Sequence, residues 1–365
     1  MPTLVGVSKR RRAVEQETGT ATMLHDGDWV NETGSQFRGI LKVLVDTGRV
    51  PGGTVVIGSV HTWEFVSVGE LAPQYLPGAE PGPGVRYDVA SLTKILATWT
   101  LTGRAVLDGL LDLDVPLEHY IAGGPYPGGQ VTTRQILTHT SALDAEVALE
   151  RYAETDRDLA EAILSTPVGP GGYCYIDRGF ILLGQVLHRI LGAPLDELAA
   201  EMWATAGMPA TGYGPAARGA GVAPTEVRLR GAAPTWGVVH DEGAALLGGV
   251  AGHAGVFSTA TDVGAFARDL LRTYAGEGGA SELARFLRDS WQPHVRVEPG
   301  LWRGLAWLVT ESGVVYHTGF TGTSLHLHPA SGRYVGVLTN AVHFGRDRNR
   351  AQELRTAAHA ALSER

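Results

Sequence analysis

The stretch YDVASLTKIL (residues 87–96) places a lysine inside apolar sequence, one helical turn after a serine. The chain contains only three lysines, Lys9, Lys42 and Lys94, and a buried lysine is costly because its ammonium group loses hydration. If a helix begins at Ser91, residues three apart lie on one face, with Cβ atoms about 5–6 Å apart. We therefore expect the Lys94 ammonium group to reach the Ser91 hydroxyl.

A Ser91–Lys94 pair of this kind is typical of nucleophilic catalysis. Burial lowers the pKa of a lysine, so Lys94 could act as a base near neutral pH and activate the serine hydroxyl. The preceding loop (residues 76–85) is rich in proline and glycine and would set Ser91 at a helix N-terminus, where N–H groups can stabilise an oxyanion. The alternative is a chance spacing of serine and lysine. The pattern G-x-S-x-G does not occur in the sequence, which disfavours an ordinary α/β-hydrolase.

Composition and charge narrow the class of protein. The 365 residues are 44% hydrophobic and 19% charged, as in one large globular domain or two intimate ones. A net charge of −8 argues against nucleic acid as the main partner, and no apolar run approaches the roughly 18 residues that span a membrane. Cys174, the only cysteine, permits no intrachain disulfide and is expected to be a small buried hydrophobe. These features predict a cytoplasmic protein, unless a leader precedes this sequence.

The hydrophobic pattern predicts an α+β fold in which both ends of the chain contribute strands to one sheet. Residues 1–34 show no clear period and are expected to form an irregular arm. Residues 35–97 and 295–365 form the predicted sheet domain. Residues 98–294 form a mainly helical domain inserted between these two segments.

The element boundaries follow from periodicity and from turn residues. Helices are predicted at residues 36–50, 177–192, 261–274 (with Thr261 as the N-cap) and 347–362. Strands are predicted at residues 53–60, 62–71, 303–311, 313–319, 323–330 and 333–340. The last four strands form an antiparallel meander, since glycine or proline turns separate them.

The stretch GGYCYIDRGF (residues 171–180) supplies a second candidate base. A tyrosine needs a cationic neighbour to act as a base, and Lys94 could be that neighbour for Tyr175. Asp177 could hold the lysine through a charge-assisted hydrogen bond. The alternatives are that Tyr175 is a core aromatic residue and Asp177 a helix N-cap, with Tyr173 as a rival for the tyrosine role.

The stretch YHTGFTG (residues 316–322) ends a predicted strand with His317, Thr318 and Gly319. A glycine at this position lets a substrate approach the backbone closely. The N–H group of Phe320 could then donate a hydrogen bond to an oxyanion. The alternative is an ordinary hairpin turn.

Two histidines of the next predicted strand raise the question of a metal site. His326 and His328 alternate along the strand and therefore share a face, as two metal ligands would. No third ligand follows at a suggestive spacing in the sequence. We expect neither a metal nor another cofactor.

Four stretches of the sequence, taken in chain order, resemble the serine hydrolase family that contains class C β-lactamases, D-alanyl-D-alanine carboxypeptidases and related esterases. YDVASLTK is similar to the family's Ser-x-x-Lys box. VTTRQILTHTSAL (residues 131–143) is similar to its His-Thr-Ser-Gly-Leu segment, with Ala142 in place of glycine. YCYID resembles its Tyr-x-Asn box with Asp177 in place of asparagine, and YHTG its Lys-Thr-Gly box with His317 in place of lysine. Residues 238–262 are similar to the esterase-like branch in particular.

This resemblance covers about residues 36–345 and implies a fold in which the active site lies between an antiparallel sheet and an all-helical domain. It implies that Ser91 is the acylated nucleophile. It also implies that Lys94 and Tyr175 share the base and acid duties. The backbone N–H groups of Ser91 and Phe320 would form the oxyanion hole.

Two departures from the family pattern bear on the substrate. By the resemblance, Asp177 orients Lys94, and His317 lines the sheet side of the pocket with Thr318 and Gly319. In β-lactamases and carboxypeptidases the residue at the place of His317 is a lysine that helps to hold a substrate carboxylate. A histidine is mostly neutral at neutral pH, and Asp177 adds negative charge, so both changes weaken the attraction for an anionic substrate.

The sequence therefore predicts a serine acyl-transfer enzyme that hydrolyses a neutral small-molecule ester or amide. Trp236 and Trp302, with Trp307, could form the apolar wall of its pocket, although core packing is the alternative for each. A second reading is a transacylase that passes the acyl group to an amine or alcohol in natural-product biosynthesis. Further alternatives are a β-lactamase or D,D-peptidase, and a non-catalytic binding protein on the same scaffold.

Overall fold

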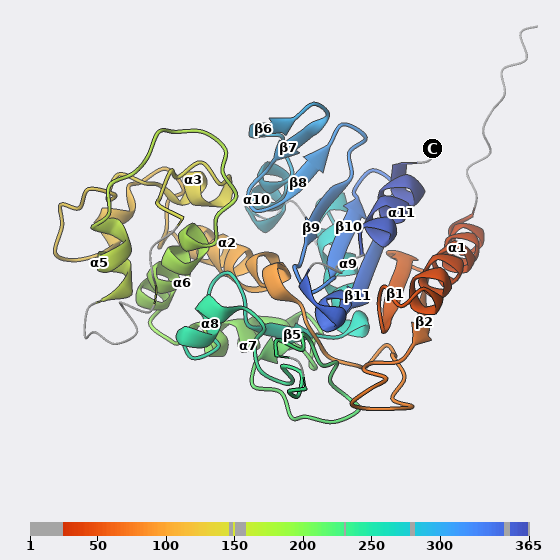
Figure 1. Cartoon of the computed structure of the whole chain (residues 1–365). Helices are drawn as coiled ribbons and strands as arrows, with labels where there is room; N and C mark the ends of the chain where they lie inside the picture. Colours follow the sequence, from red (N-terminus) through yellow and green to blue (C-terminus); the bar gives the residue numbers. More distant parts are fainter. Residues whose placement is uncertain are drawn as a thin grey trace, which may run out of the picture.

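An eight-stranded antiparallel sheet forms one layer of the protein (Figure 1). The structure is a computed structural model that describes residues 25–145, 149, 158–229, 231–277, 282–346 and 351–363. The strands lie in the order β2-β1-β11-β10-β9-β8-β7-β6. They span β1 Gly52–Ser59, β2 Trp63–Gly69, β6 Val295–Glu298, β7 Leu301–Arg303, β8 Leu308–Thr310, β9 Val315–Thr318, β10 Ser324–His328 and β11 Arg333–Thr339. Because β1 pairs with β11, both ends of the chain contribute to one sheet, and the predicted α+β fold is confirmed.

Helices cover both faces of the sheet around β1 and β11, the neighbouring strands that come from the two ends of the chain (Figure 1). These helices are α1 Asp26–Asp46, α9 Ala260–Ala275 and α11 Gln352–Ser363. Val55 and Ile57 of β1 join the apolar cluster of α1 and α11, whereas Val56 joins the cluster that contains α9. Side chains alternate between the faces of a strand, so all of β1 is buried once both faces are covered.

The remaining helices form a second part beside the sheet (Figure 1). They are α2 Thr100–Leu107, α3 Thr133–Leu137, α5 Leu159–Leu164, α6 Arg178–Leu191, α7 Leu195–Thr205 and α8 Glu242–Leu246. Helix α10 Glu282–Ser290 packs against both α9 and α2 and so lies between the two parts. A small sheet of β3 Tyr87–Asp88, β5 Val256–Ser258 and β4 Gly212–Tyr213 leads the chain into the Ser91 segment. Within the described ranges, no helix has the length and apolar character needed to cross a membrane.

The first helix starts earlier than the sequence predicts. α1 begins at Asp26, inside the segment expected to be an irregular arm, and ends at Asp46. Trp29 and Val30 are buried with Phe37 in the cluster against the sheet, so tertiary packing stabilises this end of the helix. Residues 1–24 of the predicted arm lie outside the described residues.

The helix α9 differs from the prediction in its cap and in its place. Thr259, not Thr261, is the N-cap, because the N–H group of Asp262 donates to its hydroxyl at 3.1 Å. α9 packs against β1 and β11, although its residues fall within the predicted helical domain. A helix period shows that a stretch is helical but not which layer it joins.

The predicted strand at residues 303–311 is interrupted in the structure. β7 ends at Arg303, Ala306 takes a φ of 70° in the turn that follows, and β8 begins at Leu308. The short β6, which the sequence analysis missed, pairs with β7 at the edge of the sheet. The closing helix α11 begins at Gln352, and residues 347–350 of its predicted range lie outside the described part of the chain.

Candidate active site

A cavity of about 350 Å³ is lined by segments that are far apart in the sequence. Its lining residues are Ala90, Ser91, Tyr175, Asp177, His240, Asp241, Glu242, Ala254, Thr318, Gly319, Phe320, Arg346 and Arg355. The fold thus brings the Ser91 segment, the segment before α6 and the end of β9 around one space. These are three of the four stretches that resemble family boxes.

The geometry of the Ser91 segment matches the expected serine–lysine contact. Ser91 lies in a short 3₁₀ helix (Ala90–Leu92), and a π-helical segment (Lys94–Trp99) follows. Lys94 Nζ donates to Ser91 Oγ at 2.9 Å. The residue before the serine, Ala90, takes a φ of 48°, which costs on the order of 1 kcal/mol for a residue with a Cβ atom. Its N–H group donates to Asp88 Oδ1 at 2.8 Å, which fixes this strained turn.

The groups around Lys94 decide its charge. The side chain is fully buried, and Nζ donates to Asp177 Oδ1 at 2.6 Å and to the carbonyl oxygen of His253 at 3.4 Å. Burial lowers the pKa of Lys94, but the Asp177 carboxylate and Tyr175 outweigh burial and raise the pKa above its ordinary value. The predicted fall in this pKa is therefore wrong. Lys94 is an ammonium group at neutral pH, so it donates to the Ser91 oxygen and cannot accept its proton.

Tyr175 is the tyrosine that faces the cavity. Its exposed fraction is 42%, and its ring centroid lies 5.1 Å from Lys94 Nζ. The ring stacks on His139 at 4.4 Å between centroids. The rival Tyr173 is not among the lining residues, and its hydroxyl accepts a hydrogen bond from Arg303 at 2.9 Å. Tyr175 is thus not a core aromatic residue, and it is the one of the two that a substrate can reach.

Asp177 stands at the N-cap position of α6, yet its side chain makes no capping hydrogen bond. The carboxylate accepts instead from Lys94. Burial raises the pKa of Asp177, but the charges of Lys94 and His253 have the larger, opposite effect. The pKa of Asp177 therefore lies below its ordinary value, and the carboxylate stays ionised.

The expectation that Cys174 is buried is wrong, because this cysteine is exposed.

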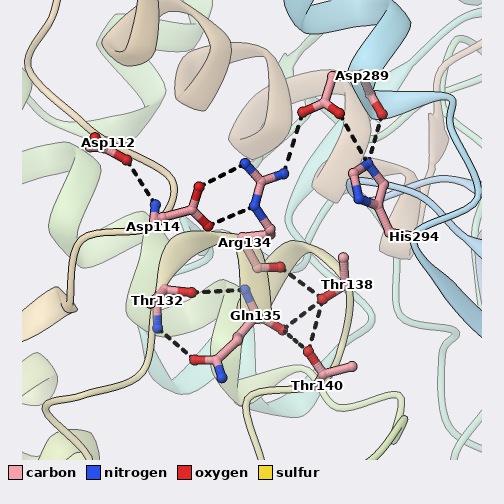
Figure 2. Close-up of polar contacts among 9 residues, drawn as sticks. All are labelled: Asp112, Asp114, Thr132, Arg134, Gln135, Thr138, Thr140, Asp289 and His294. Carbon is pink, nitrogen blue, oxygen red and sulfur yellow. Dashed lines mark hydrogen bonds and ion pairs between the residues drawn. The ribbon is translucent and has the colours of Figure 1, made fainter.

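Polar contacts anchor the α3 segment (Figure 2). Thr132 and Gln135 form a reciprocal capping box at the start of α3. Figure 2 shows Arg134 between two carboxylates, with Asp114 at 2.7 Å and Asp289 of α10 at 3.3 Å. These contacts hold α3 against α10 and fix where the chain goes next.

The chain after α3 forms the support for the Tyr175 ring. His139 is buried, has a φ of 55°, and accepts a hydrogen bond at Nδ1 from the N–H group of Ile176 at 3.3 Å. Ala142 takes a φ of 54°, a conformation that favours glycine, the residue found there in the family pattern. The sequence analysis identified this segment by resemblance but assigned His139 no role.

The turn after β9 is both a hairpin turn and a wall of the cavity. The N–H group of Gly319 donates to the Thr323 carbonyl oxygen at 2.8 Å, and the turn joins β9 to β10. A Cβ atom on Gly319 would lie 2.4 Å from the carbonyl oxygen of Val89, two residues before Ser91. The close approach that requires glycine is therefore between two backbone segments of this chain. Ser91 and Phe320 both line the cavity beside this contact.

Three residues predicted for the pocket do not line it. His317 is buried, and burial together with Arg303 holds its pKa well below the ordinary value, so it is neutral. Trp236 donates its indole N–H to a backbone carbonyl 2.8 Å away, and Trp302 packs against the hydrophobic core. Trp307 is fully buried in that core, which confirms the alternative of core packing for this residue. No pattern in the sequence distinguishes an aromatic residue that lines the cavity from one that packs in the core.

Five charged or polar residues of the cavity were not predicted, and they are His240, Asp241, Glu242, Arg346 and Arg355. Three of them lie in the stretch that resembles the esterase-like branch, which was the available signal. Glu242 pairs with Arg346, and Asp241 Oδ1 lies 2.8 Å from His253 Nε2. The imidazole of His240 stacks on the Phe320 ring at 5.7 Å between centroids. These carboxylates therefore already have partners.

Arg355 of α11 has no such partner. Its Nη2 donates to the carbonyl oxygens of Gly319 at 2.7 Å and Thr323 at 3.2 Å. Burial lowers its pKa to about 10, so the guanidinium remains charged at neutral pH. Among the residues that the structure describes, no carboxylate forms an ion pair with it. One uncompensated positive charge therefore lies beside the Gly319–Phe320 turn.

The two histidines considered as metal ligands have other partners. His326 Nε2 lies 2.9 Å from Ser324 Oγ, and His328 Nδ1 lies 2.8 Å from Ser331 Oγ. Over the described ranges, no three His, Cys, Asp or Glu side chains come together as metal ligands would.

Comparison with protein families and curated sequences points to one group of enzymes. A family model described as Beta-lactamase matches residues 37–360. A curated protein of Escherichia coli O157:H7, named "Putative D-alanyl-D-alanine carboxypeptidase", is 28% identical over 308 residues, which cover 71% of this chain and 70% of that protein.

Solved structures share the fold. The class C beta lactamase from Rhodobacter sphaeroides has a TM-score of 0.69 and 20% sequence identity, covering 91% of this chain and 98% of that chain. The crystal structure of SurE has a TM-score of 0.71 and 24% identity, covering 92% of this chain and 76% of that chain.

Proposed function

The chain belongs to the beta-lactamase family of serine hydrolases, and on this premise we propose that it transfers acyl groups through an ester intermediate on Ser91. The observation that carries the proposal is the buried Lys94 ammonium group, 2.9 Å from the Ser91 hydroxyl at the wall of a cavity. A buried ammonium so close to a hydroxyl stabilises negative charge on that oxygen. The most suitable substrates are small esters or amides.

In the proposed reaction, Ser91 Oγ attacks the substrate carbonyl carbon while its proton passes to the deprotonated hydroxyl oxygen of Tyr175. Lys94 stabilises the negative charge on the Tyr175 oxygen before the transfer and on Ser91 Oγ during it, and the N–H groups of Ser91 and Phe320 stabilise the oxyanion. Tyr175 then returns the proton to the leaving alcohol or amine as the bond to the carbonyl carbon breaks. A water molecule repeats the sequence on the acyl-serine, giving the free acid and restoring the serine.

Labelling with a fluorophosphonate probe tests the nucleophile. We expect intact mass spectrometry to show one adduct per chain, and peptide mapping to place it on Ser91. The Ser91→Ala variant should remain folded by circular dichroism and take up no probe. An adduct that persists in this variant, or a wild-type chain that takes up none, would contradict the proposal and favour a binding protein.

Hydrolysis of a neutral ester is the first form of this proposal. The carboxylates that line the cavity are already paired, Asp177 with Lys94, Asp241 with His253, and Glu242 with Arg346. An alternative form is transfer of the acyl group to an amine or alcohol. Adding a primary amine during ester turnover distinguishes the two, since an amide product that outcompetes the acid requires a transacylase.

A second candidate function is cleavage of a substrate that carries a carboxylate, as in a D,D-carboxypeptidase. Arg355 favours it, because an unpaired guanidinium attracts a carboxylate through charge-assisted hydrogen bonds. The name of the curated relative from Escherichia coli agrees with it. The sequence argument for a neutral substrate rested on the lost charge at His317, and Arg355 supplies a positive charge elsewhere in the same cavity.

Two esters that differ only in a terminal carboxylate or its methyl ester decide between these substrates. If Arg355 binds the carboxylate, we expect kcat/KM to be higher for the acid, and Arg355→Met to remove about a 10- to 100-fold advantage. Arg346→Met is the matched control, because this arginine also lines the cavity but pairs with Glu226 and Glu242. Equal kcat/KM for both esters in the wild-type chain would leave the neutral ester as the substrate class.

A further inference from the structure

A second buried cation lies behind Tyr175. Arg303, the last residue of β7, is 2% exposed. Its Nη1 donates to the carbonyl oxygen of Ala306 at 3.1 Å and its Nη2 to the hydroxyl of Tyr173 at 2.9 Å. The central carbon of the guanidinium lies 5.6 Å from the centroid of the Tyr175 ring.

This buried charge is not balanced by an anion. Within the described part of the chain, no carboxylate forms an ion pair with Arg303, and its Nε has no hydrogen-bond partner. A buried charge without a counterion is costly, because the desolvation of the ion is not repaid by an attraction nearby. A residue needed only to pack a turn would not have to be charged.

The other groups around Tyr175 leave a net positive charge there. Lys94 Nζ lies 5.1 Å from the ring centroid and carries Asp177 as its counterion. His139 stacks on one side of the ring, and His317 lies 6.4 Å away between centroids. Burial and the positive charge of Arg303 hold the pKa values of both histidines well below the ordinary value, so both are neutral. These groups therefore include two cations and one carboxylate.

We propose that Arg303 is a positioning residue for acyl transfer, whose buried charge stabilises the deprotonated Tyr175 that accepts the proton of Ser91. The inference rests on the proposed role of Tyr175 as the base. At 5.6 Å from the ring centroid, the buried guanidinium is close enough to act on a proton transfer at Tyr175. With Lys94 occupied by Asp177, Arg303 is the cation that leaves the excess of positive charge at the phenol. No bond to Arg303 forms or breaks in this step.

The pH dependence of kcat/KM tests this role. In Arg303→Gln we expect the rising limb of the profile to move upward by about 1 to 2 pH units, the shift expected when a neighbouring charge is lost. At a fixed pH on the rising limb, the same shift lowers kcat/KM of Arg303→Gln by about 10- to 100-fold relative to the wild-type chain. Arg303→Lys keeps the charge and should restore most of the wild-type profile. A profile that does not move in Arg303→Gln, or one that moves equally in Arg303→Lys, would overturn the proposal.

A matched variant separates charge from structure. Tyr173→Phe removes the hydrogen bond from Arg303 but leaves the guanidinium in place, so the rising limb should stay where it is in the wild-type chain. If Tyr173→Phe moves the limb as far as Arg303→Gln does, then Arg303 acts by holding the Tyr173–Tyr175 segment, and the electrostatic role is wrong. Should Arg303→Gln fail to fold, Arg303→Met removes the charge in its place and is compared with the same two variants.

A spectroscopic titration separates failure of this inference from failure of the proposed function. With ¹³Cζ-labelled tyrosine, the Tyr175 resonance is identified by its loss in Tyr175→Phe and followed with pH. We expect it to titrate at higher pH in Arg303→Gln than in the wild-type chain. An unchanged titration would overturn the action of Arg303 on Tyr175. A shifted titration with full activity in Tyr175→Phe would retain that action but remove Tyr175 from the mechanism.

Discussion

Replacing Lys94 by alanine is expected to lower kcat/KM by at least about a thousandfold while the chain stays folded. The ammonium group is the charge nearest to the Ser91 oxygen, at 2.9 Å, and it also lies beside the Tyr175 ring. Without it, no positive charge lies next to the Ser91 oxygen when its proton leaves, and Tyr175 keeps only the more distant charge of Arg303. Asp177 loses its counterion, but its side chain is 44% exposed, so water can solvate the carboxylate. Pre-steady-state kinetics with a chromogenic ester should therefore show loss of acylation itself.

Lys42→Ala is the matched control for this variant. Lys42 lies on the exposed face of α1, with 68% of its side chain exposed, and pairs with Asp46. Its loss should change neither kcat/KM nor the free energy of unfolding by more than about 0.5 kcal/mol. Wild-type acylation in Lys94→Ala, with an unchanged circular dichroism spectrum, would remove the lysine from the mechanism.

The serine–lysine contact could be predicted because it is local. Ser91 and Lys94 are three residues apart, and any tight helical turn brings such residues to one face. The same holds for the placement of Asp177 before α6, since helix starts leave a clear signal in sequence. The family could also be predicted from the sequence, because several motifs that occur together in the family's order are much more specific than any one of them.

What the sequence did not reveal depends on contacts between distant segments. The sequence named Asp177 as a partner of Lys94, but the pKa of Lys94 was predicted in the wrong direction because the balance between burial and this partner depends on their distance, which is 2.6 Å. Arg303 and Arg355 come from β7 and α11, and no local pattern shows that either side chain points toward the site. The prediction that Trp236 and Trp302 line the pocket was wrong for the same reason. An aromatic residue suits a pocket wall and a core equally well.

Replacing Gly319 by alanine is the second change with a large expected effect. A Cβ atom there would lie 2.1 Å from Thr323 Oγ1 and 2.4 Å from the Val89 carbonyl oxygen. One of these is backbone, so the turn after β9 must move away from the Ser91 segment. Such overpacking typically costs about 1–3 kcal/mol of stability. Because the displaced turn carries the N–H group of Phe320, we also expect kcat to fall by about 100- to 1,000-fold, as when one oxyanion donor is lost.

Two further variants tell whether the distance between the backbones causes this loss. Gly84→Ala is the control, because a Cβ atom on Gly84 meets no atom within 4 Å, and it should leave kcat and thermal stability unchanged. Adding Thr323→Ala to Gly319→Ala removes the hydroxyl from the clash but leaves the Val89 carbonyl oxygen. The double variant should therefore recover only part of the activity. Full recovery would mean that the Thr323 hydroxyl alone excludes a side chain at Gly319, and full activity of Gly319→Ala itself would mean that the turn can move without disturbing the oxyanion hole.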